Sequence, residues 1–300
     1  MRPDSASPAP APVSGSAWRW WLPSAPAGDG LAQAVAAAQA QNRSALSLYL
    51  PVCFPDRLTG RDALHLLAQA ADVIELGVPD PQAVLAGPDI QEASRIALTA
   101  GFCMKDVFDA ASELAATSST ALLVTASWQP IRDHGLAEFA AEATSVGICG
   151  VMIPDLPAHE ENGWLKTAAG VGLAVIPFIS PRTRPDRLAA IVAGATGMVY
   201  APATDGPTGT AQPISPQLPD LSAQLRALTS LPIATGLGIS TPAQARTAAA
   251  SADLVAVGSA VIRRMQARPR AQIAAAAAVS REFAAALRPD AQPDPDRGPR

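Results

Sequence analysis

The sequence predicts an α/β fold, a TIM (β/α)8 barrel with an extra helix before the first strand and disordered ends. Strand-like and helix-like segments alternate with a period of about 25 to 30 residues, which is typical of repeated βα units. The strand-like segments are nearly continuous apolar runs, so both faces of the sheet are expected to be buried, as in a parallel sheet covered by helices. Eight such units fit within the 300 residues, as the barrel requires. An open doubly wound sheet is the alternative; it requires two halves with a crossover switch, which the sequence does not show.

One domain is expected over residues 29–287, because 300 residues with 49% hydrophobic content suffice for one barrel-sized core. Residues 1–28 and 288–300 are rich in proline and lack any helical or strand period, which predicts disorder. The first of these segments also contains Trp18, Trp20 and Trp21. Whether they dock on a surface or belong to a solvated tail stays open.

The expected strands lie at 46–54, 72–78, 121–127, 150–153, 172–179, 197–201, 232–236 and 253–258. The expected helices are 30–43, ahead of the first strand, a helix beginning near Pro88, and 60–70, 135–147, 185–195 and 241–252. Gly147 suits the C′ position that ends a helix. Thr241 followed by Pro242 is typical of an N-cap and first turn.

Charge and composition exclude several classes of partner. The net charge is −4 and the 22 basic residues form no run, which argues against a nucleic-acid or anionic-membrane surface. No apolar run reaches the roughly 18 residues of a membrane span, and no secretory signal is visible, so a cytoplasmic protein is expected. Cys53, Cys103 and Cys149 have no paired spacing and are expected to be reduced thiols, with no metal site. The expected ligand is a small molecule or another protein.

Glu75 is the main candidate for a catalytic residue, because it is an acid inside the apolar strand expected at 72–78. Burial raises the pKa of a carboxyl group, and a Glu that titrates near neutrality both gives and takes protons. A core Glu paired to an Arg or a backbone donor explains the residue equally well when it is considered alone.

Glycine-rich loops follow the last strands, at the end of the barrel where active sites lie. Gly236 and Gly238 follow the seventh strand, and Gly258 and Ser259 begin the last helix after the eighth. Backbone N–H groups and a helix N-terminus at this place favour a phosphate. The loop 200–210 could close over a ligand and bring Thr208 and Gly209 to the same phosphate; an ordinary surface loop is the alternative.

The remaining polar residues favour structural roles. His65, His134 and His159 are assigned to helices, the last to a first turn, and none has a metal-ligand partner four residues on. Asp155 directly follows the fourth strand. A functional role and a helix cap both fit it, and the cap is the commoner case.

Several segments occur in the order of a known family: IELGVP (74–79), GPDIQ (87–91), GVMIPDLP (150–157), GPTG (206–209), GLGIST (236–241) and VGSAVI (257–262). On these motifs the chain resembles the tryptophan synthase alpha subunit family as a divergent member, over about residues 30 to 270. The resemblance implies a TIM-barrel lyase that cleaves indole-3-glycerol phosphate to indole and glyceraldehyde 3-phosphate by retro-aldol chemistry without a cofactor. It also implies a tryptophan synthase beta subunit as partner, in an alpha2-beta2 type of assembly.

The resemblance assigns roles to individual residues. Glu75 is the acid/base with Tyr200 beside it, Ile90 and Leu237 line the indole pocket, and Thr208 contacts the substrate. The phosphate is held by Gly209, Gly236, Gly238, Gly258 and Ser259.

The loop after the second strand departs from the family pattern. Ala86 stands where the family has an Asp that accepts the indole N–H, and Gln82 replaces another Asp that resembles a contact to the partner. SWQP (127–130) stands where the family has a Tyr and an Asn near the site. Loss of one preorganised group at a developing charge costs about 3 to 4 kcal/mol, or roughly 10² to 10³ in rate. Asp80 or Asp89 could substitute, although the position of Asp89 in a helix's first turn is explained by the helix dipole alone.

Three hypotheses follow. The first is an alpha-type carbon-carbon lyase with impaired activity. The second is a catalytically silent phosphate-binding barrel that activates or scaffolds a beta-type subunit. The third is a lyase for another phosphorylated substrate, with the loop changes as specificity changes.

Overall fold

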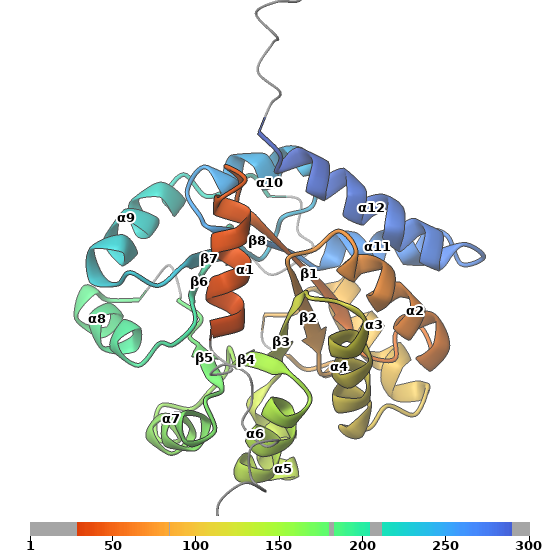
Figure 1. The fold of residues 1–300 in the computed structure, drawn as a ribbon, viewed down its shortest axis with the longest axis horizontal. Helices are drawn as coiled ribbons and strands as arrows, with labels where there is room; N and C mark the ends of the chain where they lie inside the picture. The colour runs from red at the N-terminus through yellow and green to blue at the C-terminus, as the bar shows by residue number, and fades with distance from the viewer. Residues whose placement is uncertain (1–28, 84, 180–182, 205–211, 290–300) are drawn as a thin grey trace, which may run out of the picture.

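The computed structural model describes residues 29–83, 85–179, 183–204 and 212–289, and they form the expected (β/α)8 barrel (Figure 1). The strands are β1 (Ala45–Pro51), β2 (Val73–Gly77), β3 (Ala121–Thr125), β4 (Ile148–Met152), β5 (Ala174–Ile176), β6 (Val199–Pro202), β7 (Ile233–Gly236) and β8 (Leu254–Val257). They pair in parallel in the order β5-β4-β3-β2-β1-β8-β7-β6. A parallel bridge between Phe178 and Tyr200 joins the two ends of this sheet. The ring is therefore closed, and the open-sheet alternative is wrong.

The helices surround this ring (Figure 1). They are α1 (Asp29–Gln39), α2 (Arg57–Ala68), α3 (Pro88–Thr99), α4 (Lys105–Thr117), α5 (Trp128–His134), α6 (Leu136–Ser145), α7 (Glu161–Gly170), α8 (Pro185–Ala193), α9 (Leu218–Leu228), α10 (Pro242–Ala249), α11 (Ser259–Gln266) and α12 (Gln272–Ala286). No helix among the described residues is long and apolar enough to cross a membrane.

The local signals in the sequence fix several helix ends correctly. Thr241 forms a capping box with Gln244, and Gly147 has the positive φ of 89° expected after a helix. Helix α2 begins earlier than predicted, at Arg57, because the Asp56 carboxylate accepts from the N–H groups of Leu58 and Thr59.

Several observed helices have no counterpart among the expected ranges, and three of them show why. Helix α5 is a single short element that begins on Trp128, α7 contains two glycines, and α9 begins in a proline-rich stretch. Apolar contacts with the barrel, supplied by residues such as Trp164 at 0% exposure, stabilise them in place of local propensity.

Helix α1 closes the N-terminal end of the barrel. It lies across the middle of the ring in Figure 1. Its buried residues Leu31, Val35 and Ala38 form one cluster with inward-facing residues of the strands, which include Ala45, Val73, Leu123, Ala174, Met198 and Leu254. Because this end is filled, ligand access is expected at the opposite end, where the strands finish.

Candidate active site

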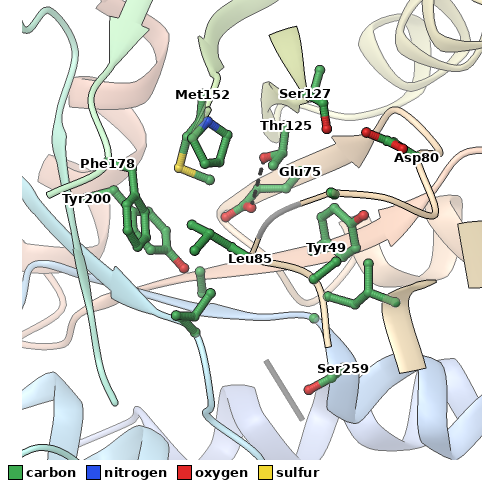
Figure 2. A pocket seen from close by; sticks show the side chains of 18 of the residues that line it. Tyr49, Glu75, Asp80, Leu85, Thr125, Ser127, Met152, Phe178, Tyr200 and Ser259 are labelled. Carbon is green, nitrogen blue, oxygen red and sulfur yellow. Dashed lines mark hydrogen bonds between the residues drawn. The ribbon is translucent and has the colours of Figure 1, made fainter. Parts of the chain in front are cut away.

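A pocket lies at the C-terminal ends of the strands and holds about 900 Å³ of space, its open mouth included. Its walls come from most of the barrel units (Figure 2). The residues that line it include Tyr49, Glu75, Asp80, Leu85, Ala86, Ile90, Thr125, Phe178, Tyr200, Leu237, Gly238, Gly258 and Ser259.

Glu75 lies in β2 with 3% of its surface exposed. Its carboxylate accepts hydrogen bonds from the Ser47 hydroxyl (Oγ to Oε1, 2.8 Å) and the Thr125 hydroxyl (Oγ1 to Oε2, 3.3 Å). Burial raises the pKa of Glu75, and the two hydroxyl donors oppose that shift only in part. Within the described ranges no Arg or Lys contacts this carboxylate, so its burial is not explained by an ion pair with them, and an acid/base group fits.

Tyr200, on β6, is a second buried group of the pocket. Burial, followed by the charge of Glu75, raises the pKa of its phenol, while a hydrogen bond with the Leu237 backbone lowers it. The phenol therefore stays protonated at neutral pH. Its ring stacks on Phe178, with centroids 5.8 Å apart.

The loop after β7 is shaped around Tyr200. A Cβ added at Gly236 would lie 1.9 Å from the Tyr200 hydroxyl oxygen, so only glycine leaves room for this phenol. Leu237 has a φ of 57°, and Gly238 has a φ of 96° and lies against the Thr204 side chain. Positive φ at Leu237 costs free energy, and such strain is typical of functional loops.

Gly258 and Ser259 lie at the start of α11, as predicted. Ser259 is buried and lines the pocket. No side chain caps the N-terminus of α11 at Gly258. Because Gly258 and Ser259 line the pocket, the N-terminal N–H groups of this helix lie at the pocket end of the barrel. An anion is favoured at such a helix terminus.

The loop after β2 supplies the wall nearest the mouth. Leu85, Ala86 and Ile90 line the pocket with apolar surface, and Asp80 lines it with a carboxylate. Asp89 is directed elsewhere, since its Oδ2 lies 3.4 Å from Nη1 of Arg263 on α11. Of the two acids considered as substitutes for the one absent at Ala86, only Asp80 lies on the pocket.

Asp155 lines the pocket, so a functional role stays a prediction, and its carboxylate also acts as a cap, although not of the helix that follows it. Its Oδ1 accepts from the Trp128 N–H at 2.9 Å, and so it caps α5 of the preceding unit. His159 precedes α7 instead of lying in its first turn. His65 and His134 belong to α2 and α5, where His134 packs on the Phe108 and Phe139 rings.

No group of His, Cys, Asp and Glu side chains within the described ranges is arranged to hold a metal ion. Cys53, Cys103 and Cys149 are all free thiols.

The structure brings most of the predicted site residues together. Glu75, Ile90, Tyr200, Leu237, Gly238, Gly258 and Ser259 all line the one pocket. Gly236, which directly precedes Leu237, makes room for the Tyr200 hydroxyl, and its contact with the phosphate stays a prediction. Thr208 and Gly209 lie outside the described residues.

Three polar residues around Glu75 were missed by the sequence analysis: Ser47, Tyr49 and Thr125. Tyr49 is the register partner of Glu75 on β1, and Ser47 lies two residues before it on the same strand face. Their alternation within LSLYL was the available signal, because a polar residue at every second position marks one face of a strand.

Comparison with known proteins agrees with this geometry. The chain matches the family described as Tryptophan synthase alpha chain over residues 35–288. The tryptophan synthase alpha chain of Streptomyces coelicolor is 40% identical over 232 residues, which are 77% of this chain and 86% of that protein. The alpha chain of Acidothermus cellulolyticus is 38% identical over 232 residues, with 77% and 86% of the two chains covered.

A solved structure of Mycobacterium tuberculosis tryptophan synthase superposes with a TM-score of 0.80 at 32% identity, covering 86% of this chain and 98% of that chain. Both the sequence match and the fold match therefore extend over the whole barrel. The chain belongs to the tryptophan synthase alpha chain family.

Proposed function

We propose that this protein is a carbon-carbon lyase that cleaves indole-3-glycerol phosphate to indole and glyceraldehyde 3-phosphate. The observation that carries the proposal is the buried Glu75, held by two hydroxyl groups, in a pocket that also holds the Tyr200 phenol and the α11 N-terminus. An acid/base group, a protonated phenol and an anion site thus face one cavity. The alpha-chain relatives favour this reaction over other phosphate chemistry.

Glu75 carries the proton transfers in this proposal. Burial raises the pKa of Glu75 and so favours its protonated form, whose proton is given to C3 of the indole ring. The ring becomes cationic, and the bond from C3 to the glycerol carbon breaks with its electron pair returning to the ring. The hydroxyl on that carbon loses its proton to the Glu75 carboxylate as the aldehyde forms, which restores the acid. No cofactor enters this scheme, because the indole ring itself accepts the electrons.

Ser47 and Thr125 keep this carboxyl group in position. Their hydroxyls hold the two oxygens of Glu75 from neighbouring strands, β1 and β3. Both hydroxyls accept as well as donate hydrogen bonds, so they can serve the protonated and the ionised acid in turn. Tyr200, held neutral, donates to the substrate oxygen beside Glu75.

The phosphate is proposed to lie at Gly238, Gly258 and Ser259, with Thr208 and Gly209 completing its site. Ser259 is the buried hydroxyl at this end of the pocket, and the α11 terminus adds N–H donors. Leu237 and Ile90 provide apolar surface for the ring. The pocket geometry and the family resemblance together support Gly238, Gly258, Ser259, Leu237 and Ile90, and the resemblance alone supports Thr208 and Gly209.

We also propose that the missing acid at Ala86 lowers the rate. Ala86 lines the pocket with a methyl group, and its backbone carbonyl already accepts from the Gln91 side chain at 2.9 Å. A turnover about 10² to 10³ below that of an enzyme with an acid at this position is expected from the loss of one electrostatic contact. A beta-type subunit is the proposed partner, in an alpha2-beta2 assembly.

The experiment is an assay of indole release from indole-3-glycerol phosphate with and without a beta subunit. Release is expected from the wild-type chain, with loss in Glu75→Gln and a gain in Ala86→Asp. Absence of release under both conditions contradicts the lyase proposal. Substrate binding without release, joined to a change in the rate of the beta subunit, supports the silent scaffolding barrel instead.

A further inference from the structure

Tyr49 is a pocket residue to which neither the sequence motifs nor the proposed reaction assigns a role. It lies on β1 as the register partner of Glu75 and lines the pocket. Its hydroxyl has no hydrogen-bond partner among the residues that the structure describes. A partly buried phenol that faces a cavity with its oxygen unpaired is available to a ligand.

Two glycines on the neighbouring strands make room for this phenol. A Cβ at Gly77, the last residue of β2, would lie 2.5 Å from the Tyr49 hydroxyl oxygen. A Cβ at Gly258, after β8, would lie 3.0 Å from the Tyr49 ring. The ring is therefore held between two strand ends, and a side chain at Gly77 would displace its hydroxyl. Gly236 makes similar room for Tyr200, so the pocket contains two phenols that are each placed by a missing Cβ.

Asp80 lies on the same side of the pocket as Tyr49 (Figure 2). Its Oδ1 accepts one hydrogen bond, from the Gln82 N–H at 2.8 Å, and no described Lys or Arg pairs with it. Burial, then the charges of Glu75 and Asp80, raise the pKa of Tyr49, so the phenol oxygen remains protonated in a region of negative potential. A group that carries a hydrogen-bond donor is favoured there, and an anion is disfavoured.

The wall around this corner is apolar. Val78, Leu85, Ala86 and Ile90 all line the pocket from the β2 end and the loop that follows it. Such a surface suits a flat ring, and the Asp80 carboxylate and the Tyr49 hydroxyl are acceptors that line the pocket on the same side. The chemistry therefore matches an aromatic ring with an N–H group on its edge.

We propose that Tyr49 and Asp80 form an acceptor corner that recognises the ring N–H of a heteroaromatic substrate. The Tyr49 oxygen accepts the N–H, and the Asp80 carboxylate stabilises positive charge on the ring when its carbon is protonated. This inference rests on the proposed function, because it assigns the indole end of that substrate to a defined place.

The test compares two non-cleavable ligands by titration calorimetry with the full-length protein. One is indole-3-propanol phosphate, and the other is its benzofuran analogue, in which oxygen replaces the N–H without added bulk. Wild type is expected to bind the indole ligand about five- to tenfold more tightly, as one hydrogen bond predicts. Tyr49→Phe is expected to abolish this preference while it changes the affinity for the benzofuran ligand less than about twofold.

Asp80→Asn provides the second variant, with a reduced preference expected because it removes the negative charge and retains the shape. Asp89→Asn is the matched control, since this acid of the same segment pairs with Arg263 and lies off the pocket; its ligand preference should equal that of wild type. Folding of each variant is checked by thermal unfolding.

The outcomes separate the two proposals. A wild-type protein that binds both ligands equally, or a Tyr49→Phe protein that keeps the indole preference, overturns the acceptor corner and leaves the lyase intact. Failure to bind either ligand, together with absent indole release, counts against the proposed function and the corner with it.

Discussion

Buried or partly buried carboxylates have different partners at the two ends of the barrel. At the N-terminal end, Asp72 accepts from Arg43 at 2.6 and 2.7 Å and from the Leu46 N–H at 2.8 Å. Asp253 accepts there from Arg226 at 3.1 and 3.2 Å and from the Ile233 N–H at 2.8 Å. At the C-terminal end, Glu75 accepts from two hydroxyls and contacts no cation in the part of the chain that the structure describes. A carboxylate that is paired with an Arg and a backbone N–H stabilises the fold. A carboxylate without a charged partner can still exchange a proton with a ligand.

The largest effect is expected from Glu75→Gln, which tests the ligand-facing end. Indole release should fall by about 10² to 10⁴, because an amide neither donates nor recovers the transferred proton. The fold should remain, since the Gln oxygen accepts from one of the two hydroxyls and its NH2 group donates to the other. Steady-state assays and circular dichroism measure the two properties. Retained turnover would remove Glu75 from the chemistry and break the contrast between the ends.

The converse change is Asp72→Ala at the closed end. The free energy of unfolding should drop by about 2 to 4 kcal/mol, because the part-buried Arg43 and the Leu46 N–H lose their acceptor. Urea unfolding measures this loss. Activity per folded molecule should stay at the wild-type level, and the exposed Glu92→Ala change, which breaks a surface pair with Arg95, serves as the control. A stable Asp72→Ala protein would contradict the structural role of this end.

Gly236→Ala addresses the placement of Tyr200. The added Cβ would lie 1.9 Å from the phenol oxygen, so the ring must shift, and displacement of a catalytic group by about 1 Å costs up to roughly 10² in rate. Indole release should fall about 10- to 100-fold by this argument. Gly163→Ala on α7 is the matched control, because no atom lies within 4 Å of its added Cβ. Equal rates for the two variants would show that the Tyr200 position does not matter.

The smallest expected effect is a pH dependence of stability that belongs to Glu75. Because burial raises its pKa in the folded state, the folded protein holds a proton that the unfolded chain has released above the ordinary Glu value. Wild type should therefore lose stability relative to Glu75→Gln as pH rises through that window, with a slope of at most about 1.4 kcal/mol per pH unit. Urea titrations of both proteins at several pH values measure the difference. A constant difference, or the opposite slope, would contradict a raised pKa.

The sequence predicted the barrel well because its determinants are repetitive. Apolar runs, caps such as Thr241 and the C′ glycine Gly147 act locally, and the structure confirms them. Helix α5 was not predicted because the N–H group of Trp128, at its start, donates to Asp155. This residue lies 27 positions away in the sequence, so no local pattern connects the two.

A site residue could be predicted where its chemistry differed from that of its neighbours. Glu75, an acid within an apolar strand, is the example. Tyr200 was reached through family resemblance alone, because a tyrosine in a buried strand is unremarkable by itself. Gly236 was recognised as important and assigned to the phosphate, whereas its nearest neighbour is the phenol of another strand. Partners of this kind are set by strand register, which becomes visible only once the ring is closed.

The helix that seals the barrel has a consequence for the order of assembly. Helix α1 precedes every described strand, yet its apolar residues share one buried cluster with strand residues from Ala45 to Leu254. During synthesis it emerges before these strands, and the cluster is complete only after the eighth strand has emerged. A helix made before the strands is therefore the last to be fully docked, and truncation of the barrel after the earlier strands would leave its apolar face exposed to solvent and to other chains.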